Sequence, residues 1–184
     1  TLEWIDGIPI ARDVVDEFAR FFAVRVTQLV DAIAKNVDHS RWLDCLNAVR
    51  ARRKGGKVGP PAILNLCSVE HVTALLEYAG VTIDETTPTG AASTAKDVLE
   101  ELAPLAPLAR QILDYRAHQH LLSGFVTPLR KPGGICKCGR TYPTWSVAKI
   151  TGRWSSSPNF QNLTKGKCPD GETFKTWAAR PIAE

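Results

Sequence analysis

Residues Thr151–Leu163, TGRWSSSPNFQNL, are the most informative stretch of the sequence. They combine one arginine, three serines, two asparagines and one glutamine, and they contain no acidic residue. Gly152 permits a positive φ angle, and Pro158 restricts the backbone of the second half. Composition alone leaves two interpretations open. The stretch is either an ordinary polar surface loop or a donor-rich surface for a ligand rich in hydrogen-bond acceptors.

The same stretch resembles a segment at the start of the palm of family A DNA polymerases, the DNA polymerase I family, where T-G-R-x-S-S is followed by P-N-x-Q-N. Four other segments resemble parts of that family in the family's order. They are GIPI at Gly7–Ile10, LNLCS at Leu64–Ser68, STAKDVLEELA at Ser93–Ala103 and LDYRAHQHLLSGFVTPL at Leu113–Leu129. The resemblance therefore covers nearly the whole chain and implies a thumb followed by the first part of a palm.

Hydrophobic periodicity predicts a mainly helical first part. Asp13–Val37 reads as one long helix, because its apolar residues recur at spacings of three and four. That stripe is Val15, Phe18, Phe22, Val26, Leu29 and Ile33. Further helices are expected over Arg41–Val49, from Ser68 to a stop at Gly80, and from a near capping box of Thr94 and Asp97 through Leu102.

A second long helix is predicted over Leu108–Val126, with Leu108, Ile112, Tyr115, Gln119 and Leu122 inward. Short strands are expected at Arg140–Trp145 and Val147–Ile150. The predicted fold class is α+β, with two long antiparallel helices in a mainly helical thumb followed by a small antiparallel β portion of the palm. We expect residues 1–129 to form the thumb-like region and residues 130–184 the N-terminal segment of the palm.

A basic run follows the second predicted helix. Its cations are Arg50, Arg52, Arg53, Lys54 and Lys57, and no acidic residue interrupts them. The run is either a solvated charged loop or a set of phosphate contacts, which would make DNA affinity salt-dependent. The resemblance favours phosphate contact, because the family's thumb tip grips the duplex backbone here.

The resemblance implies further DNA contacts at three residues. Asn65 and Ser68 match family residues that face the sugar-phosphate backbone, and Ser68 is also a plausible N-cap. Arg116 matches an arginine that faces phosphates near the primer. Two family lysines on the next turn fall at His120 and Leu122, which is a departure from the family pattern. We interpret His71 as a surface residue and Val69 as inward-facing.

The opening stretch carries the expected minor-groove contacts. Acceptors recur there in all four base pairs, so donor-rich side chains can hold a duplex of any sequence. The resemblance assigns Arg153 to the primer-terminal minor groove and Asn159, Gln161 and Asn162 to the duplex.

The chemistry implied by the resemblance is nucleotide addition, a phosphoryl transfer assisted by two Mg²⁺ ions that carboxylates hold. The family's carboxylate motifs and its nucleotide-binding helix are absent from the sequence. We therefore expect primer–template DNA as partner, dNTP as substrate of the complete enzyme, and an inactive chain by itself. Two alternatives stay open: a non-catalytic DNA-clamping subunit and a helical adaptor with an incidental basic loop.

Composition sets broader limits. The 184 residues carry a net charge of +4, which suits a polyanionic partner without proving one. No apolar run approaches the length of a membrane span. Five cysteines without a regular framework suit a reducing cytosol. We expect a cytoplasmic protein of bacterial or viral replication, and an organelle stays open as an alternative. A zinc site at Cys136 and Cys138 is disfavoured, because only Cys168 follows and no histidine does.

The sequence contains no methionine. Relative to the family it is one residue short between Gly139 and Arg153, and again between Arg153 and Pro158. We expect methionines to be missing from the sequence as given. We also expect the strand at Arg180–Glu184 to continue, in the native polypeptide or a second chain, toward the metal-binding carboxylates.

Overall fold

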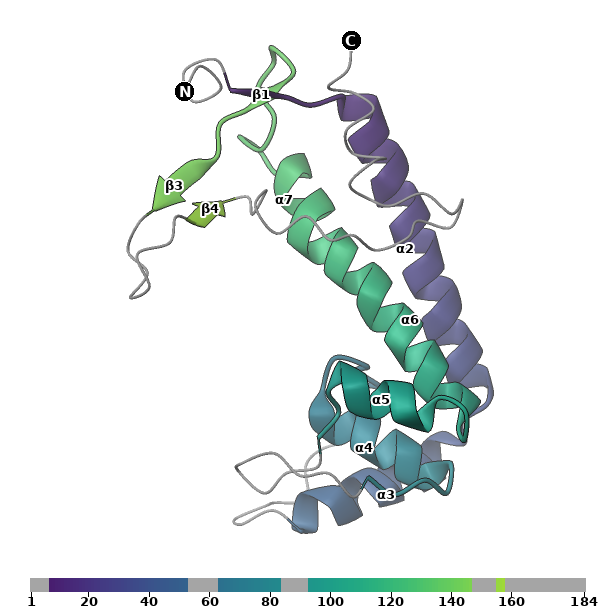
Figure 1. The fold of residues 1–184 in the computed structure, drawn as a ribbon. Helices are drawn as coiled ribbons and strands as arrows, with labels where there is room; N and C mark the ends of the chain where they lie inside the picture. Colours follow the sequence, from purple (N-terminus) through teal and green to yellow (C-terminus); the bar gives the residue numbers. More distant parts are fainter. Residues whose placement is uncertain (1–6, 53–62, 84–92, 147–154, 158–184) are drawn as a thin grey trace. The chain divides into compact units, whose positions relative to one another are not determined.

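The computed structural model describes residues 7–52, 63–83, 93–146 and 155–157 (Figure 1). It divides into two compact units, one of residues 25–118 and one of residues 1–24 with 119–184. This division by packing differs from the predicted thumb and palm segments, which follow the family and remain a prediction. Each unit has its own hydrophobic core.

The unit of residues 25–118 is entirely helical where it is described. It contains the end of α2 (Arg12–Lys35), then α3 (His39–Ala51), α4 (Val69–Tyr78), α5 (Lys96–Leu102) and most of α6 (Pro107–Leu121). Figure 1 shows α3, α4 and α5 gathered into one cluster. The fully buried side chains come from every one of these helices and from the segment before α4. The largest are Trp42, Ile33, Leu46, Leu66, Leu75, Leu76, Leu99 and Ile112.

The other unit combines the first half of α2 with the end of the second long helical run. Val15, Phe18 and Phe22 of α2 pack in one cluster with Leu121 and Phe125. In the helical unit, Ile33 near the end of α2 and Ile112 near the beginning of α6 belong to the same core cluster. The start of α2 thus shares a core with the end of the second run in one unit, and the end of α2 shares a core with the start of α6 in the other, which agrees with the predicted antiparallel order.

Helix α2 matches the predicted helix closely. Its expected stripe is buried at Val15, Phe18, Phe22, Leu29 and Ile33, and Val26 is half-buried. Asp13 lies in the first turn and Lys35 in the last, where each complements the helix dipole. The periodic pattern succeeded here because one face of a long helix supplies both cores.

The second long helical run extends beyond its predicted end. After α6, one π-helical turn, η1 (Leu122–Val126), leads directly into α7 (Thr127–Arg130). Pro128 does not end the helix because it lies in the first turn of α7, where its missing N–H is tolerated. Lys131, which precedes Pro132, is extended and ends the run.

The buried face of this helical run differs in part from the predicted stripe. Ile112 is buried as predicted, but Leu108, Tyr115, Gln119 and Leu122 are only half-buried. The buried residues of the run are Ala109, Ile112, Leu121, Phe125 and Val126. A π turn inserts a residue into the α-helical repeat, so the buried face shifts from Leu122 onward, and Phe125 and Val126 are the residues buried there.

The described strands form two antiparallel pairs. β1 (Ile8–Pro9) pairs with β2 (Arg140–Thr141), and β3 (Thr144–Ser146) pairs with β4 (Ser155–Ser157). The predicted strand Arg140–Trp145 is thus divided at Pro143, while Val147–Ile150 lies outside the described residues. These short pairs confirm the expected α+β class.

Long-range contacts hold the start of α2 and the segment before it against residues 135–142. Arg140 Nη1 donates to the carbonyl oxygen of Gly7 at 3.0 Å, and Arg12 Nη2 donates to that of Ile135 at 3.0 Å. Gly7 has a φ of 71°, and an added Cβ would lie 2.7 Å from the Tyr142 ring. Both the backbone angle and this close approach require glycine at this position.

Two predicted caps differ from the structure. α5 begins one residue later than expected, with Ala95 as N-cap and no side-chain cap bond. Thr94 does not cap it, because its hydroxyl accepts a hydrogen bond from Arg116 instead. Ser68 occupies the N-cap of α4 as predicted but makes no side-chain cap bond. Gly80 ends α4 with a φ of 79°, as predicted.

Cys136 and Cys138 form a disulfide, and their Cα atoms are 5.2 Å apart. Neither a pair of free thiols nor a zinc ligand pair describes them. Cys45 and Cys67 are free cysteines, and Cys168 lies outside the described residues. Within the described part of the chain, no group of three or more metal-ligating side chains comes together. Nor is any helix of that part long and apolar enough to cross a membrane.

Candidate nucleic-acid interface

The segment Asn65–Ser68 forms a compact turn at the start of α4, which we call the Asn65 turn. The side-chain oxygen of Asn65 accepts a hydrogen bond from the backbone N–H of Cys67 at 2.9 Å. The backbone N–H of Ser68 donates to the carbonyl oxygen of Asn65 at 3.0 Å. Such an Asx-type turn is a local preference of asparagine, so residue type alone favours this geometry.

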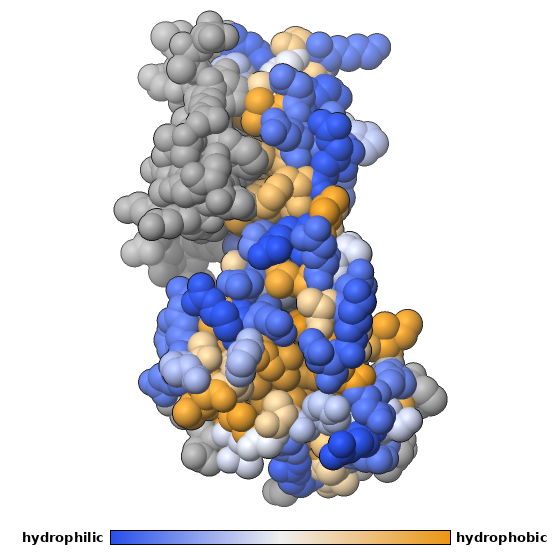
Figure 2. Space-filling view, turned by 90° about the vertical axis from the view of Figure 1, so that its right-hand side faces the viewer, coloured by the Kyte–Doolittle hydropathy of each residue, from blue (hydrophilic) through white to orange (hydrophobic). Residues whose placement is uncertain are grey.

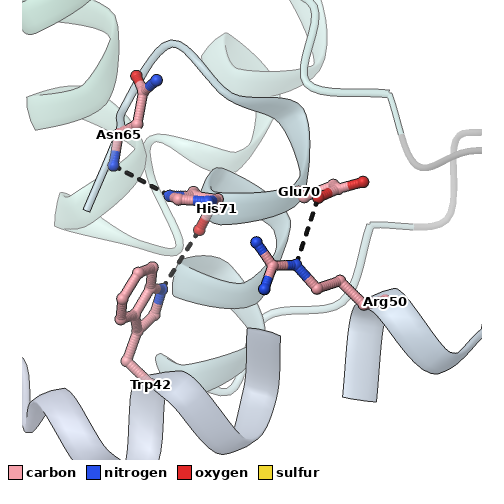
Figure 3. Close-up of polar contacts among 5 residues, drawn as sticks. All are labelled: Trp42, Arg50, Asn65, Glu70 and His71. Atoms are coloured by element: carbon pink, nitrogen blue, oxygen red, sulfur yellow. Dashed lines mark hydrogen bonds and ion pairs between the residues drawn. The ribbon is translucent and has the colours of Figure 1, made fainter. Parts of the chain in front are cut away.

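His71 ties the Asn65 turn to the helix that follows it (Figure 3). Its Nδ1 accepts a hydrogen bond from the backbone N–H of Asn65 at 3.0 Å. The Trp42 indole of α3 donates to the carbonyl oxygen of His71 at 3.5 Å, and the two rings meet edge to face with centroids 5.4 Å apart. His71 is only 8% exposed, so its interpretation as a surface residue was wrong. Val69, expected to face inward, is 44% exposed.

The imidazole of His71 is held in its neutral form. Burial lowers the pKa of His71 from its ordinary value, and the positive charge of Arg50 lowers it further. A neutral ring that accepts at Nδ1 carries its proton on Nε2. The hydrogen bond to Asn65 therefore requires one protonation state and one tautomer.

The first two cations of the basic run have carboxylate partners from α4. Arg50 Nε lies 3.6 Å from Glu70 Oε2 (Figure 3), and Arg52 forms an ion pair with Glu77. Arg50 Nη1 is buried and meets no acceptor among the described residues. No acidic residue lies within the run in the sequence, but the fold places the carboxylates of α4 beside its first two cations. Arg53, Lys54 and Lys57 lie outside the described residues.

The side chain of Arg116 in α6 forms hydrogen bonds with other segments of the chain. Its Nε donates to the carbonyl oxygen of Leu66 at 3.0 Å, and its Nη1 to the carbonyl oxygen of Thr94 at 2.6 Å. Its Nη2 donates to the Thr94 hydroxyl at 3.3 Å. These bonds connect α6 to the Asn65 turn and to the segment before α5. Burial lowers the pKa of Arg116, although Cys67 acts in the opposite direction.

Tyr115 touches the same turn from α6. Burial raises the pKa of its phenol, and the neighbouring Cys67, which also hydrogen-bonds it, raises that pKa further. The Asn65 turn is thus held from both sides: by His71 of α4, and by Tyr115 and Arg116 of α6. Figure 2 shows hydrophobic and hydrophilic residues mixed over the face that it draws.

The predicted minor-groove residues Arg153, Asn159, Gln161 and Asn162 lie outside the described residues. Of the stretch that contains them, the structure describes Ser155–Ser157, which form β4. The structure brings Asn65, Ser68, Arg50 and Arg116 into one unit, around the start of α4. It leaves their contact with DNA a prediction.

Sequence reasoning missed Trp42, His71 and Thr94 as supports of this site. One signal was present for His71. It stands three residues after Ser68, the spacing of a capping box, in which the third helical residue reaches back to an N–H that precedes the helix. No comparable local signal exists for Thr94, whose partner is 22 residues away.

The sequence model of DNA polymerase family A matches residues 57–178. This match includes the Asn65 turn, Arg116 and the stretch Thr151–Leu163. The chain therefore belongs to DNA polymerase family A.

Two curated relatives are DNA polymerase I of Streptococcus pneumoniae, from strains TIGR4 and R6. Each is 39% identical over 108 residues, which cover 58% of this chain and 11% of the relative. The chain thus matches about a ninth of the length of these relatives. The fold is similar to that of the POL domain of Pol1 from M. smegmatis, solved in complex with DNA primer-template and dNTP. The TM-score is 0.60 at 21% identity, over 90% of this chain and 25% of that one.

Proposed function

We propose that this chain is the thumb and first palm segment of a template-directed DNA polymerase, and that it grips the primer–template duplex. The observation that carries the proposal is the family match across residues 57–178, which include the braced Asn65 turn. That turn leads into a helix whose N-cap serine makes no side-chain cap bond. A helix N-terminus favours a phosphate, so Asn65 and Ser68 are our proposed backbone contacts.

Arg153, Asn159, Gln161 and Asn162 are the proposed minor-groove readers. Their amide and guanidinium donors suit the acceptors that every base pair presents there. Arg153 is assigned to the primer end. Arg116 has five N–H donors, of which three are used within the chain. We propose that its contribution to DNA binding includes holding the Asn65 turn.

Catalysis is assigned to residues beyond this chain. The described residues bring together no set of metal ligands, so they do not fit the two Mg²⁺ ions of a polymerase site. We propose that carboxylates outside the chain hold these ions and that dNTP is the substrate of the complete enzyme. The chain alone should bind primer–template without extending it. The bacterial relatives favour a cytoplasmic replication or repair enzyme of a bacterium or phage.

The experiment is a salt titration of DNA affinity by fluorescence anisotropy, with primer–template and blunt duplex of several sequences. Replacing Arg50, Arg52, Arg53, Lys54 and Lys57 with alanine should weaken binding to every sequence. The slope of log affinity against log salt should fall by roughly 0.9 for each phosphate contact removed.

A matched pair of variants separates the basic run from general charge. One variant replaces Arg53, Lys54 and Lys57 with alanine and keeps both ion pairs to α4. The other replaces Arg25, Lys35 and Arg110, three exposed cations of the same unit. The first should lose more affinity than the second. Equal losses of DNA affinity in the two variants, or no loss at low salt, would support the interpretation of the run as a solvated charged loop.

A further inference from the structure

We propose that His71 is the positioning residue of the DNA grip: as a neutral imidazole it fixes the Asn65 turn, so that acidification releases the turn and weakens DNA binding. This inference rests on the proposed function for its last step. Its first step, the fixing of the turn, stands on geometry alone.

One hydrogen bond connects the beginning of the turn to the helix. The bonds within the turn use the side-chain oxygen and the carbonyl oxygen of Asn65, whereas its N–H donates to His71 Nδ1 at 3.0 Å. Asn65 is itself exposed, but this hydrogen bond is part-buried. Without this acceptor the Asn65 N–H loses its protein partner, and the turn loses the bond that ties its first residue to α4. The position of Asn65, a proposed phosphate contact, thus depends on the ring.

The ring itself has little freedom to move. His71 is 8% exposed, its ring meets Trp42 edge to face, and its own carbonyl oxygen accepts from the Trp42 indole. Because Trp42 is 1% exposed in the core, its contact with the imidazole adds a second restraint, from α3. The chain of contacts runs from core tryptophan to histidine to turn.

Protonation would break this arrangement. An imidazolium donates from both nitrogens and accepts at neither, so Nδ1–H would face the N–H of Asn65. The charged or titratable groups around the ring and the turn, by element, are Arg50 of α3, Glu70 of α4, Cys67 of the turn, and Tyr115 and Arg116 of α6. Glu70 is paired with Arg50. A positive charge on His71 would therefore lie near the positive charge of Arg50, and the carboxylate of Glu70 is already paired with Arg50.

Two substitutions separate the acceptor from the ring. In His71→Asn, a side-chain oxygen can take the place of Nδ1 and accept from Asn65, but it cannot be protonated in this pH range. In His71→Leu, a side chain of similar bulk offers no acceptor. Since the site is buried, the leucine variant tests the hydrogen bond without adding a polar group.

The first measurement is amide hydrogen exchange at Asn65 in the 184-residue chain, resolved by NMR, which needs no DNA. The wild type should protect this amide at pH 7.5 and lose protection on acidification. His71→Leu should exchange roughly tenfold faster at pH 7.5. His71→Asn should stay protected with no added dependence on pH.

The second measurement is primer–template affinity by anisotropy from pH 5.5 to 7.5 at constant ionic strength. Wild-type affinity should fall on acidification, and His71→Asn should flatten this profile. His71→Leu should bind roughly tenfold more weakly at pH 7.5. His39→Asn, at an exposed histidine of the same unit, is the matched control and should keep the wild-type profile. Because the His39 ring lies 5.4 Å from that of Trp42, between centroids, this variant also tests for an effect that acts through Trp42 alone.

The outcomes separate the two claims. Unchanged Asn65 exchange in His71→Leu, or a wild-type pH profile in His71→Asn, would overturn the inference. If His71→Leu does not fold, the pH profile of His71→Asn still decides it. Failure of the wild-type chain to bind DNA at any pH would refute the proposed function, whereas the exchange result would still report on the turn.

Discussion

At the scale of single residues, the polar side chains around α4 bind other segments of the chain. Arg116 donates to two carbonyl oxygens and a hydroxyl of other segments, and Arg50 and Arg52 meet carboxylates. Exposed ion pairs contribute little to stability, whereas hydrogen bonds from a half-buried guanidinium to backbone carbonyls contribute more. Arg116 is therefore the residue of this group on which the fold depends most.

Arg116→Lys should reduce the free energy of unfolding by about 2 kcal/mol, because one ammonium group cannot reach the carbonyl oxygens of both Leu66 and Thr94. Urea unfolding followed by circular dichroism would measure the change. Arg110→Lys is the control, since Arg110 is exposed on the same helix and pairs only with Asp114 among the described residues. Equal stability of the two variants would contradict the structural role of Arg116.

His71 also makes stability depend on pH. The pKa of His71 is lowered in the folded state from a reference of 6.5, so the unfolded chain binds the proton more tightly. Stability should therefore be complete above pH 6.5 and decline as the pH falls below that value. The urea midpoint, measured from pH 7.5 to 5.5, should fall less in His71→Asn than in the wild type. A parallel decline in both would show that other groups carry the effect.

At the scale of elements, the helix boundaries depend on how each end is satisfied. Asp38 caps α3 by accepting from the backbone N–H groups of Ser40 and Arg41, at 2.9 and 3.2 Å. α5 has no such cap, since Ala95 occupies its N-cap with a φ of −62° and a ψ of 162°. This backbone suits a capping side chain.

Ala95→Ser should thus raise the free energy of unfolding by about 1 kcal/mol, because the new hydroxyl can accept from the open N–H groups of the first turn. Thermal and urea unfolding would measure the gain. Ala117→Ser, at an exposed position within α6, should lower stability by about 0.5 kcal/mol. A loss in both variants would mean that α5 does not begin at Lys96.

The π turn at Leu122–Val126 affects packing at the scale of elements. It joins α6 to α7 within one helical run and lets Leu121, Phe125 and Val126 all reach the same core. His120 meets the Phe125 ring edge to face, with centroids 5.7 Å apart. The position of a family lysine is thus occupied by a side chain that packs within its own unit.

At the scale of the whole molecule, we propose that this chain binds the DNA and that carboxylates outside it hold the metal ions. Binding energy spread over many duplex contacts holds the DNA, while one contact at the primer end positions the reacting group. The missing-methionine and strand-continuation hypotheses concern residues outside the described part of the chain, and they remain predictions. The boundary between the thumb and palm segments also remains a prediction.

In the complete enzyme, Arg153→Ala should slow primer extension by roughly a hundredfold while changing DNA affinity by about threefold or less. The reason is that a single groove contact adds little to total binding but orients the primer terminus. Single-turnover extension and anisotropy would measure the two quantities. Asn162→Ala provides a comparison within the same stretch, with a smaller expected effect on rate. Equal losses of rate and affinity for Arg153→Ala would make this arginine a plain DNA anchor.

The sequence by itself determined those features that depend on neighbours along the chain. Helix α2 could be predicted because its stripe repeats with the helical period. The stop at Gly80 could be predicted because glycine tolerates a positive φ. The family could be recognised from Thr151–Leu163 and the segments before it, because their residue types and order are themselves the signal.

Only the tertiary structure decided what depends on distant segments. His71 is buried because α3 covers it with Trp42, 29 residues earlier, and Arg116 is engaged because Leu66, 50 residues earlier, presents its carbonyl oxygen. The carboxylates of Glu70 and Glu77 reach Arg50 and Arg52 only because α4 packs on α3. Burial and partner choice arise from packing between helices, and no local pattern encodes which charges will meet there.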